Sequence, residues 1–322
     1  MDYRFCAAIA LGGLAVAACG DPTTNDPTAP SVETGAGLQD LGLAAASNTW
    51  SLRARMPAAR KYASAARVGS VIYVIGGTTG NITFTTNVQA YNVTTNTWSV
   101  KRPLPSAQAF GNGASVINGK IYVTGGYFDS SLFVYDPSTN TWTRKASLPK
   151  DAFYGAQGVI NGKLYVYSGG VTGFYRYTPS TNTWATLPKP RSVHAFPAAG
   201  VIGGKFYLAG GGDDFGSVPE VEVYDPVANN WTFKAPMRTA VMGSASAVIG
   251  GKLYAAGGAD PGFPRFATLQ VYDPSTNSWA TRAPMPVARA YAAGAAANGW
   301  FYVLGGQTDF SDASPRVESY TP

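Results

Sequence analysis

Beyond residue 19 the chain has no cysteine, and its 322 residues include one histidine, His194. A body without thiols has no disulfide and no cysteine chemistry. Charged residues make up only 13% of the chain, and the net charge of +6 comes from Lys and Arg that are scattered without a run of like charge. Nucleic-acid binding usually needs a basic stripe or patch, so this distribution predicts no nucleic-acid partner.

The long apolar run lies near the N-terminus, from Cys6 to Ala18. It is too short for a comfortable transmembrane helix and fits the core of a signal peptide. The sequence "VAAC" at 16–19 resembles a bacterial lipobox, which implies a signal peptide over 1–18 and a lipid on Cys19. Simple secretion after cleavage near "AVA" at 15–17, and an uncleaved anchor, are the alternatives.

Residues 19–46 are then expected to form the lipidated cysteine and a flexible polar linker, rich in Pro, Thr and Asp at its start. The expected location is the bacterial cell envelope, periplasmic or surface, with the lipid as the only membrane contact. A secreted protein is the alternative location.

One eight-residue motif recurs along the chain. It reads "YDPSTNTW" at 135–142, "YTPSTNTW" at 177–184 and "YDPSTNSW" at 272–279, with looser copies at 91–98 and 224–231. Tryptophans at 50, 98, 142, 184, 231 and 279 have intervals of 42 to 48 residues. Gly-Gly pairs with the same spacing follow apolar, Tyr-containing runs and end at Gly77, Gly126, Gly170, Gly211, Gly258 and Gly306. Such a period predicts a propeller or a solenoid.

One unit, residues 105–148, contains four strand-like segments: "FGNGASVI", "KIYVTGG", "SLFVYDP" and "NTWTRKA". The "NGK" between the first two favours a type I′ hairpin, because Asn and Gly tolerate positive φ. Asp-Pro and the Asn before the Trp favour the next turn. Four antiparallel strands make one blade, with Trp142 and its equivalents packed between blades. We therefore interpret the repeated motif as scaffold.

These marks together resemble kelch repeats: Gly-Gly closes strand two, Tyr-Asp-Pro follows strand three and Asn-x-Trp opens strand four. The resemblance covers about 48–322 and implies an all-β fold, a six-bladed β-propeller over residues 47–322. The chain ends in "ESYTP" at 318–322, a third strand, and the body begins with "SNTWSLRAR" at 47–55, a fourth strand. We expect the N-terminal strand to close the last blade and so remove an exposed sheet edge.

The start of each first strand is expected to ring the central channel, on the face that carries the loops between strands two and three, here called the loop face. Counting back from the strand-two Tyr of each unit gives Arg60, Gln108, Ala152, His194, Val241 and Arg289. Two residues further along stand Tyr62, Phe110, Tyr154, Phe196, Gly243 and Tyr291. These side chains either line a wet channel and bond to strand ends, or bind a ligand at its mouth.

The loops between strands two and three are short in units two and three and long in the others, where they present acids and aromatics. Asp213, Asp214 and Asp309 are candidate ligand-binding residues there. Calcium binds carboxylate oxygens, and two pairs of aspartates could supply them: Asp213 with Asp214, or Asp309 with Asp312. Neither pair has the spacing of a recognised calcium loop, so we predict no metal and no cofactor.

Some kelch propellers are enzymes, so the resemblance alone does not decide the function. A copper oxidase of the galactose-oxidase kind needs more histidines and a cysteine, and no G-x-S-x-G motif supports a serine hydrolase. The remaining enzyme hypothesis resembles the periplasmic kelch mutarotases that act on sialic acid. His194 and Glu220 or Glu222 would supply acid and base, and Arg60 or Arg289 would hold the carboxylate.

The favoured interpretation is a non-catalytic cell-envelope propeller that recognises a protein or glycan on its loop face. A scaffold that uses its outer strands or the opposite face is the further alternative.

Overall fold

The computed structural model describes residues 47–80, 83–108, 111–261, 265–308 and 312–322. The chain divides into two units, Met1–Ala44 and a compact Ala45–Pro322. The predicted signal peptide, Cys19 and the linker lie outside the described residues. Among the described residues there is no helix, and so none that would cross a bilayer.

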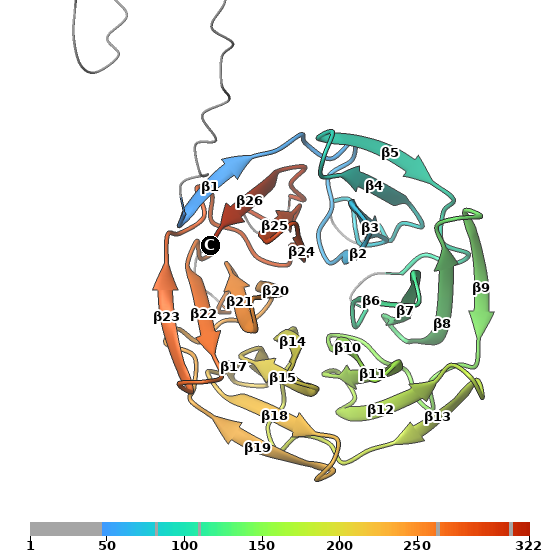
Figure 1. The fold of residues 1–322 in the computed structure, drawn as a ribbon, viewed down its shortest axis with the longest axis vertical. Coiled ribbons are helices and arrows are strands. Elements are labelled where there is room, and N and C mark those ends of the chain that lie inside the picture. Colours follow the sequence, from blue (N-terminus) through green and yellow to red (C-terminus); the bar gives the residue numbers. More distant parts are fainter. Residues whose placement is uncertain (1–46, 81–82, 109–110, 262–264, 309–311) are drawn as a thin grey trace, which may run out of the picture. The chain divides into compact units, whose positions relative to one another are not determined.

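Six four-stranded antiparallel sheets surround a central axis as the blades of a β-propeller (Figure 1). Blades 1 to 3 consist of β2 (Ser64–Val68), β3 (Val71–Ile75), β4 (Val88–Asn92) and β5 (Thr97–Lys101), then β6 (Ala114–Ile117), β7 (Lys120–Gly126), β8 (Asp129–Asp136) and β9 (Thr141–Lys145), then β10 (Ala156–Ile160), β11 (Lys163–Ser168), β12 (Gly173–Thr178) and β13 (Thr183–Thr186).

Blades 4 to 6 consist of β14 (Ala198–Ile202), β15 (Lys205–Ala209), β18 (Val221–Asp225) and β19 (Asn230–Lys234), then β20 (Ala245–Ile249), β21 (Lys252–Ala256), β22 (Leu269–Asp273) and β23 (Ser278–Arg282), then β24 (Ala293–Ala297), β25 (Trp300–Leu304), β26 (Val317–Thr321) and β1 (Thr49–Leu52). A short hairpin of β16 (Gly212–Asp213) and β17 (Gly216–Ser217) extends the loop of blade 4.

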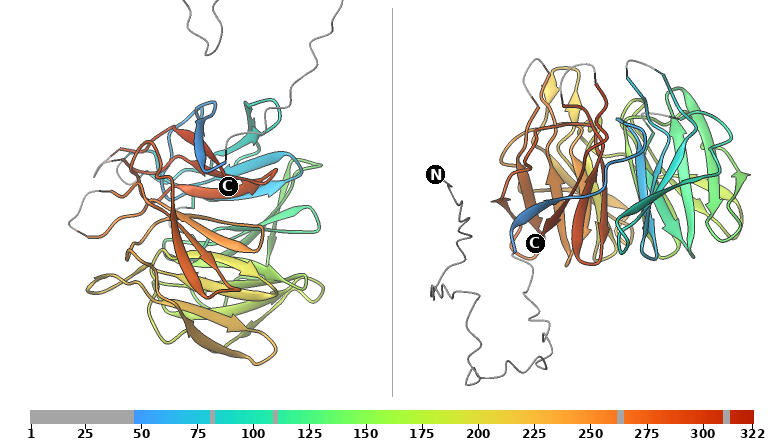
Figure 2. Two further views of the ribbon diagram at one scale, coloured as in Figure 1. Left: turned by 60° about the vertical axis from the view of Figure 1, so that its left-hand side comes forward. Right: turned by 90° about the horizontal axis from the view of Figure 1, so that it is seen from above.

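The ring closes between the two ends of the folded body. β1 pairs with β26 in antiparallel register, with Trp50 opposite Tyr320, and the two strands lie side by side in both views (Figures 1 and 2). The predicted closure of the last blade by the N-terminal strand is therefore confirmed, as is the six-bladed fold.

Tight turns follow from residues that accept positive φ. Asn118 and Gly119 have φ of 49° and 74° in the turn between β6 and β7, which fits the predicted type I′ hairpin. In blade 1 the corresponding turn has positive φ only at its first central residue, Gly69, at 58°. That pattern fits a type II′ turn, which tolerates the following Ser70.

The hydrophobic core is divided among the interfaces of neighbouring blades. One cluster joins blades 1 and 2 through Ile75, Val88 and Tyr135, and equivalent clusters join every other adjacent pair, including blades 6 and 1. Each blade is thus stabilised through its neighbours, so the closed ring is the unit of stability.

The repeated eight-residue motif ties the blades together. In blade 2 the Tyr135 hydroxyl donates to Oδ1 of Asn140 at 2.7 Å, and the same oxygen accepts the N–H of Arg102 from blade 1 at 2.9 Å. Nε1 of Trp142 donates to the carbonyl of Arg102 at 3.0 Å. Asn140 adopts φ of 54°, a conformation that Asn tolerates better than most residues. The motif is scaffold, as interpreted.

Candidate functional site

Four residues that the sequence placed on the channel wall are buried instead. Arg60 and Arg289 are each 1% exposed, His194 is fully buried and Gln108 is 5% exposed. The prediction that these side chains face the channel is therefore wrong. They belong to the segments between blades and turn into the protein, where polar residues of the third strands or nearby loops meet them.

The buried arginine of blade 6 is part of a three-residue ion cluster. Nη1 of Arg289 lies 2.7 Å from Oε2 of Glu318, and Nε of Arg316 donates to Oε1 of Glu318 at 2.5 Å. Burial lowers the pKa of Arg289, and the neighbouring Glu318 carboxylate opposes that shift. Removing one partner would leave a buried charge, so this cluster is structural.

The single histidine is held in the same way in blade 4. Nδ1 of His194 lies 2.7 Å from the carbonyl oxygen of Gly210, and Nε2 lies 3.4 Å from Oε1 of Glu222. Because a carbonyl only accepts, Nδ1 must carry a proton. Nε2 faces the Glu222 carboxylate, so the ring links the Gly210 carbonyl to the third strand of the blade.

Glu222 also anchors the chain ahead of His194. Its two carboxylate oxygens accept the N–H groups of Arg191 at 3.0 Å and Ser192 at 2.7 Å. Burial acts to raise the pKa of Glu222, but the hydrogen bonds from His194, Arg191 and Ser192 outweigh it, so the pKa lies below the usual value. Neither His194 nor Glu222 has exposed atoms for acid–base work on a ligand.

The position of Glu222 in its strand has polar equivalents in three other blades, one of them Glu318 of blade 6. Gln270 in blade 5 accepts from the N–H of Thr239 and donates to its carbonyl, both at 3.0 Å. In blade 1 the hydrogen-bonding network orients Gln89 so that its oxygen accepts from Nη2 of Arg60 at 3.3 Å. These side chains form hydrogen bonds that hold the segment between blades against the third strand. This role explains why charged and amide residues are buried here.

The aromatic residues two positions further along do surround the mouth of the channel. Tyr62, Tyr154, Phe196 and Tyr291 are half-buried and have φ between 55° and 58°, and Gly243 has φ of 68°. Their backbones form a continuous belt: Tyr62 N–H donates to Tyr291, Tyr291 to Gly243, Gly243 to Phe196 and Phe196 to Tyr154, at 2.7 to 2.9 Å. Left-handed backbone is unfavourable for aromatic residues, so this belt holds them in a strained position.

The four rings meet across the mouth as one group, the mouth cluster. Tyr62 and Phe196 come from opposite blades, yet their ring centroids are 5.7 Å apart. Phe196 also lies 5.2 Å from Tyr291 and 4.4 Å from Tyr154. Tyr291 occupies the space that a side chain at position 243 would fill. The absence of an aromatic residue in blade 5 is thus compensated by the neighbouring ring.

The electrostatics of the cluster keep its hydroxyls neutral. Burial raises the pKa of Tyr62, and the nearby Tyr291 raises it further; burial also raises the pKa of Tyr291. The guanidinium of Arg265 lies 5.8 Å from the centroid of the Tyr291 ring, a cation–π distance, and donates to Oε1 of Gln307 at 3.1 Å.

A second aromatic group, the aromatic arm, extends the mouth cluster outward over blades 1 to 3. It comprises Phe84, Tyr127, Phe128 and Phe153. Tyr127 stacks on Tyr154 with a centroid distance of 6.2 Å and contacts Phe84 at 6.3 Å. Tyr127 is 43% and Phe128 66% exposed, at the tip of the hairpin between β7 and β8. A continuous series of rings therefore runs from solvent to the channel mouth.

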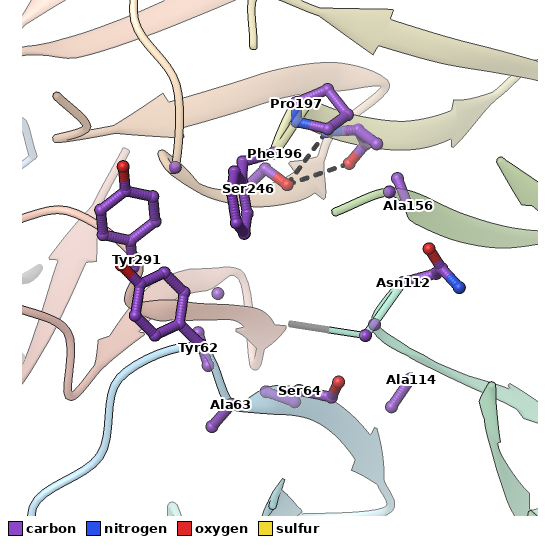
Figure 3. Close-up of a pocket in the computed structure, with 18 of the residues that line it drawn as sticks. Tyr62, Ala63, Ser64, Asn112, Ala114, Ala156, Phe196, Pro197, Ser246 and Tyr291 are labelled. Atoms are coloured by element: carbon purple, nitrogen blue, oxygen red, sulfur yellow. Dashed lines mark hydrogen bonds between the residues drawn. The ribbon is translucent and has the colours of Figure 1, made fainter. Parts of the chain in front are cut away.

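Beside the mouth cluster lies a chamber of about 250 Å³ within the central channel. Tyr62, Tyr291 and Phe196 form one wall, and Asn112, Ala114 and Ala156 face them from blades 2 and 3 (Figure 3). The side chains of Gln157, Ser64, Ser244 and Ser246 add polar groups to the wall.

The predicted acidic wall has a local structural role where it is described. Oδ1 of Asp213 accepts the N–H groups of Phe215 and Gly216, at 2.8 and 3.1 Å, and so shapes the tip of the β16–β17 hairpin, while Asp214 is exposed. Asp309 and Phe110 lie outside the described residues. Within the described ranges no group of three His, Cys, Asp or Glu residues is positioned to hold a metal ion.

Tyr127, Phe128 and Phe153 of the aromatic arm were not identified from the sequence, nor were the polar residues of the chamber. Adjacent aromatics in a two-residue turn, "GYFD" at 126–129, were the available signal, because such turns favour Gly, Asn and Asp. Asn112 and Gln157 carried no such signal, since nothing in a single unit shows which side chain reaches the channel.

Two family models match the chain. The KLHDC2/KLHL20/DRC7 Kelch-repeats domain matches residues 111–306, and the Kelch motif matches residues 59–105. No curated protein matches the chain in sequence. Among solved structures, that of YjhT is similar with a TM-score of 0.70 and 18% identity, covering 81% of this chain and 94% of that one. At this identity the similarity shows the fold alone.

The match to the first model spans more than half of the chain, and the second adds the first blade. Propellers of this type serve in general as binding and interaction modules. The chain belongs to the kelch-repeat family of β-propellers.

Proposed function

We propose that the protein is a non-catalytic binding propeller that recognises a protein or glycan ligand on its loop face. The observation that carries the proposal is the series of aromatic rings from the exposed Phe128 through Tyr127 and Tyr154 to the mouth cluster. Tyr side chains combine a large apolar face with a polar tip, and they are enriched at recognition sites for this reason.

Backbone strain supports the same surface. Phe128 has φ of 54° with two thirds of its side chain in solvent. A bulky residue in the left-handed region costs about 1–2 kcal/mol, and in the free protein the ring packs on Tyr127 and Phe153 while most of it stays in solvent. Strained, exposed aromatics are a feature of ligand sites, where a partner covers them.

The buried polar pairs favour binding over catalysis. A sugar mutarotase of the kind considered above would need His194 with Glu220 or Glu222, and Arg60 or Arg289, in contact with the ligand. His194, Glu222, Arg60 and Arg289 are at most 1% exposed and are engaged with other residues of the propeller, which leaves Glu220 as the member of that set with exposed surface. The enzyme hypothesis would therefore require a different set of residues.

The test compares aromatic truncations on two faces. The double variant Tyr127→Ala/Phe128→Ala removes the exposed tip of the aromatic arm. Phe233→Ala is the matched control, because Phe233 is 47% exposed on the outer strand β19. Binding is measured on a glycan array and by crosslinking to cell-envelope proteins. We expect loss of binding in the double variant alone; loss in Phe233→Ala alone would move the interaction to the outer strands.

We also propose that a lipid on Cys19 anchors the protein in the envelope, as its only membrane contact. The support is the lipobox-like "VAAC" at 16–19 followed by a polar segment. Metabolic labelling with a fatty-acid analogue tests this: Cys19→Ser should lose the label and release the protein from the membrane fraction. Release of an unlabelled wild-type protein would indicate simple secretion.

A further inference from the structure

The chamber beside the mouth cluster is enclosed by the first strands of the blades, which are edge strands of their sheets. An edge strand directs alternate N–H and C=O groups away from its partner strand. Ala199 shows how such groups can be used: Oγ of Ser246, from the next blade, accepts its N–H at 3.1 Å and donates to its C=O at 3.2 Å (Figure 3). Ser246 thus satisfies the two groups of Ala199, and the first strands of the other blades direct their own alternate N–H and C=O groups toward the channel.

Neutral polar side chains add to these backbone groups. Asn112 is 1% exposed, and its Nδ2 donates to the carbonyl of Ala152 at 3.0 Å. Its Oδ1 has no hydrogen-bond partner among the described residues. A buried amide oxygen without a donor is destabilising, and because this oxygen has no exposed surface it is a local cost within the wall and not an open acceptor of the chamber.

The chamber carries no formal charge. In the described part of the chain none of the residues that line it is Asp, Glu, His, Lys or Arg. Burial raises the pKa of both Tyr62 and Tyr291, so these hydroxyls keep their protons near neutral pH. Arg67 lines the channel further along, outside the chamber. A charged ligand would lose its hydration here without gaining an opposite charge.

The size of the chamber favours a small occupant. Its volume of about 250 Å³ is below the roughly 300–1,000 Å³ of sites that hold drug-sized ligands. One six-membered ring with its substituents suits this volume, and the chamber continues into the rest of the channel past Ala65, Ala114 and Gly294. Aromatic rings form one wall of the chamber and amide side chains lie on the other. A ring-shaped ligand with an apolar face and a polar rim therefore suits this lining.

We propose that the chamber is a binding site for a small neutral polyhydroxylated molecule, a single monosaccharide or a cyclitol. The apolar face of the ligand lies against Tyr62 and Phe196, and its hydroxyls bond to the edge strands and amides opposite. This site shares Tyr62, Phe196 and Tyr291 with the aromatic series proposed above as the recognition surface and rests on that proposal, while the exposed tip, Tyr127 and Phe128, lies outside the chamber.

The experiment measures binding of defined probes to the full-length protein by calorimetry and ligand-observed NMR. The neutral probes are D-glucose, D-galactose and myo-inositol, and the charged counterparts are D-glucuronate and D-galacturonate. Ala199→Leu adds three carbon atoms at a residue that lines the chamber. Ala296→Leu is the matched control, because it adds the same atoms on an inner strand in the lower part of the channel, outside the chamber.

We expect at least one neutral probe to bind, and its uronate to bind at least about tenfold more weakly. Ala199→Leu should weaken the affinity for the neutral probe at least about tenfold, corresponding to about 1.4 kcal/mol of binding free energy. Ala296→Leu should leave that affinity unchanged. Equal or tighter uronate binding, no effect of Ala199→Leu in a variant that melts like the wild type, or no binding of any neutral probe would each overturn the proposal. The Tyr127→Ala/Phe128→Ala variant should retain the neutral probe.

Discussion

The hydroxyl of Tyr320 donates a 2.8 Å hydrogen bond to Oδ1 of Asn48, although the two residues are 272 positions apart. The same oxygen accepts the N–H of Ala283 at 2.9 Å. Within a single blade the pair is Tyr135 and Asn140, five positions apart. The propeller therefore uses the bond that shapes each blade to join the two ends of its folded body.

Replacement of Asn48 by Ala should destabilise the protein by about 2–3 kcal/mol, because two hydrogen bonds are lost and Ala is placed at a φ of 59°. Chemical denaturation with Asn140→Ala as the control measures this. Both variants should lose similar stability. If Asn140→Ala is destabilised and Asn48→Ala is not, the terminal strand contributes nothing to closure.

Deletion of residues 48–56 should have a much larger effect, since it removes β1 and leaves β26 as an open sheet edge. Met56 in the core between blades 6 and 1 is lost as well. Calorimetry should show a lower and broader unfolding transition, and light scattering should show association through the exposed edge. A truncated protein that melts as high and as cooperatively as the full chain would contradict the closure.

The sequence was sufficient for the scaffold because its marks are local and repeated. The Tyr-to-Trp motif is a local device whose copies share one structural role, so "YTP" at the C-terminus and "SNTW" at 47–50 could be joined without knowledge of the fold. The turn types also follow from the sequence: Asn-Gly favours the type I′ turn between β6 and β7, and Gly-Ser favours the type II′ turn between β2 and β3.

The candidate site was harder to predict because it depends on where side chains point. Arg60 and Tyr62 were placed on the same wall, but the φ of 57° at Tyr62 interrupts the alternation of an extended strand. Arg60 therefore turns into the protein while Tyr62 reaches the mouth. Glu222 and Glu318, charged residues that directly follow the buried valine at the start of a third strand, were the signal that buried partners exist.

Stability at low pH should depend on the Glu222 carboxylate. Its pKa in the folded protein is lowered, so its contribution is present above the unfolded pKa, near the usual value of 4.5, and is lost as pH falls through the folded pKa. Melting temperatures of wild type and Glu222→Gln are compared across this acid range. Blade 5 already has Gln at the equivalent position, Gln270, so the substitution fits the strand.

We expect the wild-type melting temperature to fall more steeply than that of Glu222→Gln as the pH drops below about 4.5. Identical slopes for the two proteins would show that the His194–Glu222 pair makes no net contribution in acid. Asp225→Asn provides a control, because Asp225 also has a lowered pKa but pairs with the half-exposed Lys205 at the surface. Surface ion pairs of this kind contribute little to the free energy of unfolding, so Asp225→Asn should leave the acid dependence of the melting temperature nearly unchanged.

Truncation of the motif tryptophans should lower the free energy of unfolding at every interface between blades. The effect should be largest where the indole ring is fully buried. Trp231 is 4% exposed, packs against Phe174 and donates to the carbonyl of Pro188 at 2.7 Å. Trp231→Ala should cost about 3–5 kcal/mol. Trp231→Phe retains most of the packing but leaves the Pro188 carbonyl without its donor. We therefore expect Trp231→Phe to lose less stability than Trp231→Ala in denaturant titrations. An equal loss of stability in both variants would assign the whole effect to the hydrogen bond.

Phe128→Asn should separate stability from recognition. Asn is well tolerated at positive φ, whereas Phe128 has φ of 54° and is 66% exposed, so the substitution removes strain and loses little packing. The variant should be more stable by about 0.5–1 kcal/mol in denaturant titrations, while its binding on the loop face is weakened. Stabilising substitutions carry a cost where the replaced residue has a function, and the function proposed for the Phe128 ring is contact with a ligand. A variant that gains stability and binds as tightly as wild type would remove Phe128 from the recognition surface and leave Tyr127 and the mouth cluster as its remaining candidates.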